Sequence, residues 1–243
     1  MLIRQGNARD DRIDRRLASV LAAVAGGLNA AAFHAVGFFS ANMTGNVSTL
    51  SSLIALGQWM HGLGYVTIVL TFVLGATIST LAVDAGLRRA ITTIYARVVV
   101  AEGLLLIVLG VAEMGLDQER GVPLLILALS FLMGLQNAIV THISDARIRT
   151  THVSGMATDI GIEIAKLVGL RASVSEDGER RATATKLRLH VQTIACFLGG
   201  GVAGVLLYRA LDSGMLLVAS LPLFMVAIPP LLAPSMQPLR PKH

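Results

Sequence analysis

The sequence GFFSANMTGNVSTLSSLIALG, residues 37–57, decides the predicted fold because a later stretch repeats its pattern. The second copy is RIRTTHVSGMATDIGIEIAKL, residues 147–167, and the two align on Gly45 and Gly155. In each copy a small polar run ends an apolar helix, and a short helical pattern begins at the glycine. We therefore interpret the two stretches as half-helices of a duplicated chain.

Hydroxyl side chains recur at equivalent positions of the two copies. Thr44 matches Ser154, and Ser48 matches Thr158. Residues four apart lie on the same face of a helix, so each short helix would present a pair of hydroxyls on one side. The repetition favours a shared role over chance.

The composition is that of an integral membrane protein. Mean hydropathy is +0.69, with 54% hydrophobic and only 14% charged residues. The apolar residues come in runs of about twenty, the length that an α-helix needs to cross a bilayer. The formal charge is +5, but aromatic residues are scarce at 5% and are not interleaved with basic ones, which argues against nucleic-acid binding. The sequence indicates no metal site and no cofactor.

The predicted fold class is all-α, with six transmembrane helices arranged as two inverted three-helix repeats, each with a short re-entrant half-helix. Repeat A covers residues 17–114 and repeat B covers residues 122–232, within a single membrane domain at 17–232. Residues 1–16 and 233–243 are predicted cytoplasmic tails. The spanning helices lie near residues 17–36, 63–83, 91–114, 122–142, 190–208 and 214–232.

Two further motifs recur in the long helices. Gly26-Gly27-Leu28-Asn29-Ala30 is echoed by Gly134-Leu135-Gln136-Asn137-Ala138, and Phe72-Val73-Leu74-Gly75 is echoed by Phe197-Leu198-Gly199-Gly200. The spacings Gly75-xxx-Ser79 and Gly200-xxx-Gly204 are typical of close contacts between membrane helices.

The basic residues determine the predicted topology. With three crossings in each half and the N-terminus inside, the inner segments are 1–16, 84–97, 143–189 and 233–243. They hold every Lys and Arg residue except Arg120 and Arg209. This distribution satisfies the positive-inside rule, and because three is odd the halves must be inverted relative to one another. The predicted location is the bacterial inner membrane, with both termini in the cytoplasm.

The half-helices would meet near the middle of the bilayer. An extended chain over residues 38–42 descends about 16 Å, and a helix over residues 44–58 climbs back by roughly 20 Å. The N–H groups of Gly45 and Gly155 should then point toward the midplane, where they favour an anion or a polar acceptor.

We predict a substrate path from polar residues in these motifs and in the long helices. Two alternatives stay open, since the asparagines could serve as helix–helix hydrogen bonds and the half-helix residues as plain N-caps. Glu102 is included because an unpaired carboxylate inside an apolar run is costly. Asp159 and Glu163 fit either an ion-pair face or a cation or proton site. The predicted path residues are Asn29, Thr44, Gly45, Asn46, Ser48, Glu102, Gln136, Asn137, Ser154, Gly155, Thr158 and Asp159.

The sequence resembles the YoaK-like bacterial membrane proteins, a family of unknown function. The resemblance rests on Met43-Thr44-Gly45-Asn46, on Gly134-Leu135-Gln136-Asn137-Ala138 and on Thr150-Thr151-His152-Val153-Ser154-Gly155, and it covers about residues 17–232. It implies a multi-pass inner-membrane protein. Relatives often carry an acidic residue where this chain has Asn29, and this departure argues against a proton-coupled role at Asn29.

Three functions remain open at this stage. The first is a small-solute transporter or channel with its path between the inverted halves. On this interpretation we expect that the protein is not an enzyme. The others are a membrane enzyme acting on a lipid, for which no metal-diphosphate acidic motif is present, and a non-transporting scaffold or sensor. The expected partners are membrane lipids and a small solute, not nucleic acid, and a homo-oligomer also stays open.

Topology can be tested by thiol labelling in intact cells after Cys196, the single cysteine, is changed to alanine. An impermeant reagent should label Ser213→Cys strongly and Ser175→Cys hardly at all, because the Lys and Arg distribution keeps the segment around Ser175 inside. Strong labelling at Ser175→Cys would contradict the inverted-repeat arrangement.

Overall fold

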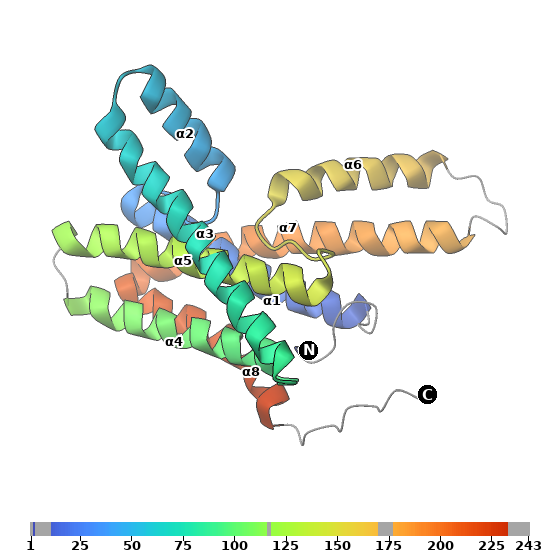
Figure 1. Ribbon diagram of the computed structural model, residues 1–243. Helices are drawn as coiled ribbons and strands as arrows, with labels where there is room; N and C mark the ends of the chain where they lie inside the picture. Colours follow the sequence, from blue (N-terminus) through green and yellow to red (C-terminus); the bar gives the residue numbers. More distant parts are fainter. Residues whose placement is uncertain (1, 3–10, 116–117, 170–176, 233–243) are drawn as a thin grey trace.

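A computed structural model describes residues 2, 11–115, 118–169 and 177–232 of the chain (Figure 1). The described residues form helices joined by short irregular segments, and no strand occurs among them. The helices are α1 (Asp11–Val36), α2 (Met43–Ala55), α3 (Trp59–Arg88), α4 (Ile94–Gly115), α5 (Gln118–Ser144), α6 (Val153–Gly169), α7 (Asp177–Leu211) and α8 (Met215–Leu232), with a 3-10 turn, η2 (Asp212–Gly214), between the last two.

Five stretches of the described chain are long and apolar enough to cross a membrane. They are Arg15–Val36, Trp59–Arg88, Ile94–Gly115, Gly121–Ser144 and Gly178–Leu232. The last is a 55-residue stretch that contains most of α7, then η2 and α8. These apolar helices confirm a multi-pass, all-α membrane protein. The division of the last stretch into two crossings, which six transmembrane helices require, stays a prediction.

The two predicted half-helices are present as separate short helices. α2 has 13 residues and α6 has 17, so they rise about 20 and 25 Å, less than the roughly 30 Å of a bilayer core. Each follows a non-helical segment, residues 37–42 before α2 and residues 145–152 before α6. Gly37 begins the first segment with a φ of 76°, a left-handed conformation that glycine adopts without strain.

The helices pack in pairs that join the first half of the chain to the second. α1 lies against α7, α3 against α5, and α4 against α8, and these are the main contacts of the bundle. The short helices pack within their own halves, α2 on α3 and α6 on α7. Figure 1 shows α2 and the first part of α3 standing away from the bundle, while the rest of α3 crosses α5 and α6 lies beside the first part of α7. Because each main pairing crosses between the halves, neither half contains a bundle of its own.

Glycines bring α1 and α7 into backbone contact. A side-chain carbon at Gly26 would collide with the carbonyl oxygen of Phe197, and one at Gly200 would collide with the carbonyl oxygen of Ala23. Gly204 likewise faces the backbone of Gly27. The expected close helix contact at Gly200 and Gly204 is therefore confirmed, and α7 is the helix that α1 approaches.

The same contact recurs between α3 and α5. A side-chain carbon at Gly75 would collide with the carbonyl oxygen of Phe131, and one at Gly134 with that of Phe72. Ser79, the small residue one turn after Gly75, is 1% exposed. The α1–α7 and α3–α5 contacts therefore use equivalent glycine motifs from the two halves.

Several sequence-based expectations fall outside the described residues. These are the C-terminal tail, most of the N-terminal tail, and the inner loop position Ser175.

Gly200 and its neighbour Gly199 allow the backbone contact to be tested with one methyl group. Gly200→Ala should destabilise the protein by roughly 1–3 kcal/mol because the new methyl overlaps the Ala23 carbonyl. Gly199 has nothing within 4 Å, so Gly199→Ala should be neutral or mildly stabilising. Thermal unfolding in detergent measures both. Equal melting temperatures for the two variants would show that the α1–α7 contact is not limited by glycine.

Candidate functional site

A cavity of about 540 Å³ lies between the two non-helical segments, and we call it the central cavity. Equivalent residues of the two halves line it in pairs. The pairs include Asn29 and Asn137 from α1 and α5, Thr44 and Ser154 from the starts of α2 and α6, and Phe72 and Phe197 from α3 and α7. Four of the predicted path residues, the two asparagines and the two hydroxyl residues, are thereby brought together.

Asn29 holds the first non-helical segment against α1. Its Oδ1 accepts a hydrogen bond of 2.8 Å from the backbone N–H of Ala41. Asn29 is 7% exposed and Ala41 is 8% exposed, so this N–H has little access to water. An acidic side chain at this position would offer the same acceptor. The bond fixes the loop that leads into α2.

Asn137 performs the equivalent task in the second half. Its Oδ1 accepts a hydrogen bond of 2.8 Å from the Thr151 hydroxyl, and its Nδ2 donates to the Met133 carbonyl over 2.8 Å. The two asparagines thus tie each non-helical segment to the helix that precedes it. The alternative of hydrogen bonds between spanning helices does not describe them.

The start of α2 differs from the expected arrangement. Asn42 caps this helix, and its Oδ1 accepts a hydrogen bond of 3.1 Å from the N–H of Gly45. The Gly45 N–H therefore points at a side chain of its own chain, and neither Thr44 nor Ser48 supplies the cap. A side-chain carbon at Gly45 would press on Asn42. Gly45 is required by the cap, and it affects the central cavity through Asn42.

At the start of α6, His152 occupies the place that Asn42 holds before α2. The N–H of Met156 donates to the His152 carbonyl over 3.1 Å, and a side-chain carbon at Gly155 would lie 2.7 Å from the imidazole. The ring also forms a 3.1 Å hydrogen bond with Arg149 Nη1. Both Arg149 and His152 line the central cavity.

Asn46, Ser48 and Thr158, three predicted path residues on the short helices, do not line the central cavity. Asn46 is 2% exposed, and its Nδ2 donates a hydrogen bond of 3.1 Å to the Phe39 carbonyl. It therefore holds the non-helical segment that leads into α2. Ser48 and Thr158 are exposed, and the Thr158 hydroxyl donates to the Ser154 carbonyl within α6. In each expected hydroxyl pair, only the first member, Thr44 or Ser154, lines the central cavity.

Glu102 and Gln136 form a separate buried pair between α4 and α5. Gln136 Nε2 donates to Glu102 Oε1 over 2.9 Å, and both residues are 0% exposed. Glu102 Oε2 and Gln136 Oε1 have no hydrogen-bond partner in the described part of the chain. Neither residue lines the central cavity. The structure thus supplies the partner that Glu102 lacked in its own helix and places both away from the asparagines.

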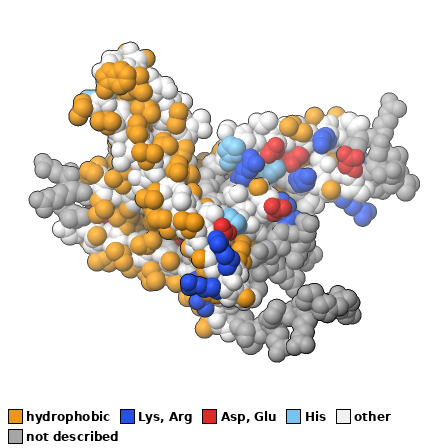
Figure 2. All heavy atoms as spheres, viewed as in Figure 1, with side chains coloured by type: hydrophobic (Ala, Val, Ile, Leu, Met, Phe, Trp, Pro, Cys, Tyr) orange, Lys and Arg blue, Asp and Glu red, His pale blue; other side chains and the backbone are white. Residues whose placement is uncertain are grey.

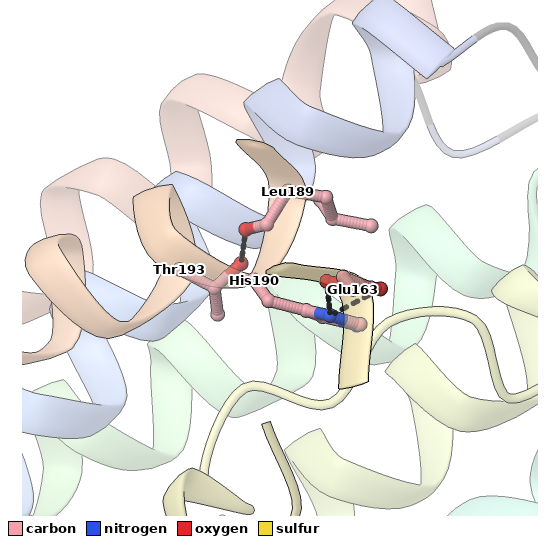
Figure 3. A network of polar contacts seen from close by, with 4 residues as sticks. All are labelled: Glu163, Leu189, His190 and Thr193. Atoms are coloured by element: carbon pink, nitrogen blue, oxygen red, sulfur yellow. Dashed lines mark hydrogen bonds and ion pairs between the residues drawn. The ribbon is translucent and has the colours of Figure 1, made fainter. Parts of the chain in front are cut away.

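One charged residue of α6, Glu163, contacts α7. Glu163 and His190 approach to 3.2 Å, as Figure 3 shows, and Glu163 is 7% exposed. The ion-pair interpretation of this helix is therefore the closer one, although the partner comes from α7 and not from α6 itself. Asp159 lines a second cavity of about 430 Å³ beside this pair.

Charge in the central cavity has one sign. Arg149 and His152 belong to its wall, and no carboxylate occurs among the described residues that line it. The starts of α2 and α6 are also there, and the N-terminus of a helix carries partial positive charge. This environment suits a solute that is neutral and polar or negatively charged.

The sequence analysis did not assign several lining residues to the site. Phe72 and Phe197 begin the repeated motifs that were interpreted only as helix contacts, and Asn42 and His152 occupy matching positions in the aligned copies. Extending the alignment one turn upstream of the glycines finds the second pair. No repeat indicates Arg149, because Phe39 stands at the aligned position of the first copy.

Asn29→Ala tests the loop anchor. The substitution leaves the Ala41 N–H without its acceptor in a buried setting, which should cost roughly 1–3 kcal/mol of stability. The exposed Ser48→Ala, on the first turns of α2, is the matched control and should be neutral. Thermal unfolding in detergent gives the comparison. An unchanged melting temperature for Asn29→Ala would mean that water or a shifted loop satisfies the amide.

Comparison with known proteins gives a family and no activity. No curated protein and no solved structure matches the chain significantly. A family model does match, over residues 17–229, and its description is protein of unknown function. The motifs that resemble the YoaK-like proteins all lie within the matched region, and the match is consistent with that resemblance. The chain belongs to the DUF1275 family.

Proposed function

We propose that this protein is a small-solute transporter or channel whose path passes through the central cavity. The observation that carries the proposal is the pairwise lining of this cavity by Asn29 and Asn137, Thr44 and Ser154, and Phe72 and Phe197. A scaffold protein would not require a cavity that equivalent residues of the two halves line from both sides. Transporters assembled from inverted repeats place their solute site at such a junction.

The reciprocal helix pairs support an arrangement of two inverted halves. α1 packs on α7 through glycine contacts equivalent to those between α5 and α3. The first helix of each half therefore packs against a helix of the other half. Figure 2 shows Lys and Arg side chains over α6, the start of α7 and the end of α3, while the α2–α3 hairpin is largely apolar. With the positive-inside rule, this charged end is cytoplasmic and both termini lie on that side.

The non-helical segments support a re-entrant path. Irregular backbone is tolerated at membrane depth only where protein buries it or where it lines a cavity. Parts of residues 37–42 and 145–152 fit these conditions, since Ala41 and Thr150 are buried and Asn42, Arg149 and Thr151 line the central cavity. The short helices then lead from the cavity toward opposite membrane surfaces.

The cavity's size and lining define the proposed solute. A volume of about 540 Å³ is within the range of small-molecule sites, and amide and hydroxyl groups provide hydrogen bonds on opposite walls. Arg149 adds positive charge to the wall, so a small polar solute, neutral or anionic, is favoured over a cation.

Thiol modification combined with solute flux tests this proposal. In a Cys196→Ala background, Thr44→Cys and Ser154→Cys should react with a small water-soluble methanethiosulfonate reagent because the central cavity admits water. Stopped-flow light scattering of proteoliposomes, with urea, glycerol and ammonium nitrate as probes, should show entry of at least one probe above that of protein-free vesicles. Modification of either cysteine should reduce this flux at least several-fold, since the added group fills the path.

Val73→Cys is the matched control. Val73 is 52% exposed on the apolar outer surface of α3, where lipid should keep the reagent away and modification should leave the flux unchanged. Unreactive cysteines at positions 44 and 154, together with no flux of any probe, would refute the proposal.

A further inference from the structure

The second cavity, which we call the charged cavity, lies between α6, α7, the start of α1 and the segment that leads into α6. Its volume is about 430 Å³. Charged and imidazole side chains from separate parts of the chain converge on it, namely Arg15 from α1, Arg147 and Arg149 from the segment before α6, Asp159 and Glu163 from α6, and Lys186 and His190 from α7. Figure 2 shows this region as the place where charged side chains gather over α6 and α7.

Positive charge is in excess around the charged cavity. Glu163 is engaged by His190, at 3.2 Å, and is held at the α6–α7 contact shown in Figure 3. Arg15, Arg149 and Lys186 form no ion pair with a carboxylate in the described part of the chain. The described lining residues therefore contain four cationic side chains, counting Arg147, and two carboxylates, Asp159 and Glu163. The excess of positive charge around the cavity favours the binding of an anion.

These charges are absent from the equivalent place in the first half. α2, the counterpart of α6, has the sequence MTGNVSTLSSLIA and carries no charged residue. The repeat alignment puts Thr49 opposite Asp159 and Leu53 opposite Glu163. The repeated scaffold therefore folds without the charged cavity, which makes it an addition of the second half.

The positive-inside rule alone does not explain the arrangement. That rule requires basic residues anywhere in the inner segments, as Arg88 and Arg89 at the end of α3 illustrate. It does not require basic side chains from α1, the α5–α6 segment and α7 to line one hollow. Convergence on a cavity is the property of a binding site.

We propose that the charged cavity binds a phosphate group. The planar fork of arginine matches two phosphate oxygens, and lysine adds a compact charge, so three arginines and a lysine around one space favour phosphate over a monovalent anion. The cavity is larger than phosphate alone, which leaves room for the organic part of a phosphate ester. Two sources share this chemistry, a soluble phosphate compound and the headgroup of an anionic phospholipid at the inner surface. The proposal is independent of solute transport.

Binding to the purified full-length protein tests the site. Calorimetric titration in detergent uses sodium phosphate and sodium pyrophosphate at constant ionic strength, and native mass spectrometry measures phosphatidylglycerol retention against phosphatidylcholine. Arg15→Gln and Lys186→Gln should each weaken phosphate or phosphatidylglycerol binding roughly tenfold or more, because each removes a charge-assisted contact. Asp159→Asn should strengthen binding, since it removes the opposing charge.

Arg88→Gln and Arg89→Gln are the matched controls, because they remove the same charge at exposed positions away from the cavity. Both should bind within about twofold of the unmodified protein if the site is local. Pyrophosphate binding in detergent identifies a soluble ligand, whereas selective retention of phosphatidylglycerol alone identifies the lipid headgroup. The proposal is overturned if neither probe binds, or if Arg15→Gln and Lys186→Gln bind as well as the controls while remaining monodisperse and helical.

Discussion

The contact of backbone on backbone between α1 and α7, and between α3 and α5, is the constraint on which the rest of the structure depends. Gly26, Gly200, Gly75 and Gly134 allow the helix axes to approach until carbonyl groups occupy the space of a side chain. In a bilayer, where lipid tails are as apolar as leucine, close packing of this kind is a main source of helix association. It also interlocks the halves, because each pair takes one helix from each half.

Such close pairs leave the polar ends of the motifs in defined places. Three residues beyond Gly26 is Asn29, and three beyond Gly134 is Asn137, so the glycine contacts set the depth of both asparagines. Each asparagine then holds the irregular chain that follows its helix. The central cavity is the space between those two segments. Its walls are therefore formed by packed helices and by two segments that the asparagines anchor.

The two halves share this scaffold and differ in charge. The wall of the central cavity contributed by the second half carries Arg149 and His152 where the first half has Phe39 and Asn42. Arg149 lines the charged cavity as well, so the segment before α6 separates the two spaces. A ligand in the charged cavity would therefore contact a residue that also lines the proposed path.

The sequence by itself determined the long apolar helices, the two short helices with polar entries and the membrane class, because hydrophobic runs, helix length and turn residues act locally. It also indicated that Asn29, Asn137, Thr44 and Ser154 belong together, since the repeat placed them at equivalent positions.

Only the tertiary structure decided which residues meet across the fold. Gln136 is the partner of Glu102, His190 is the partner of Glu163, and Asn42 supplies the cap of α2 where a hydroxyl was expected. The first two partners lie on other helices, at 34 and 27 residues along the chain. Periodicity within one helix contains no information about such pairs, because they depend on how closely and at what depth two helices pack.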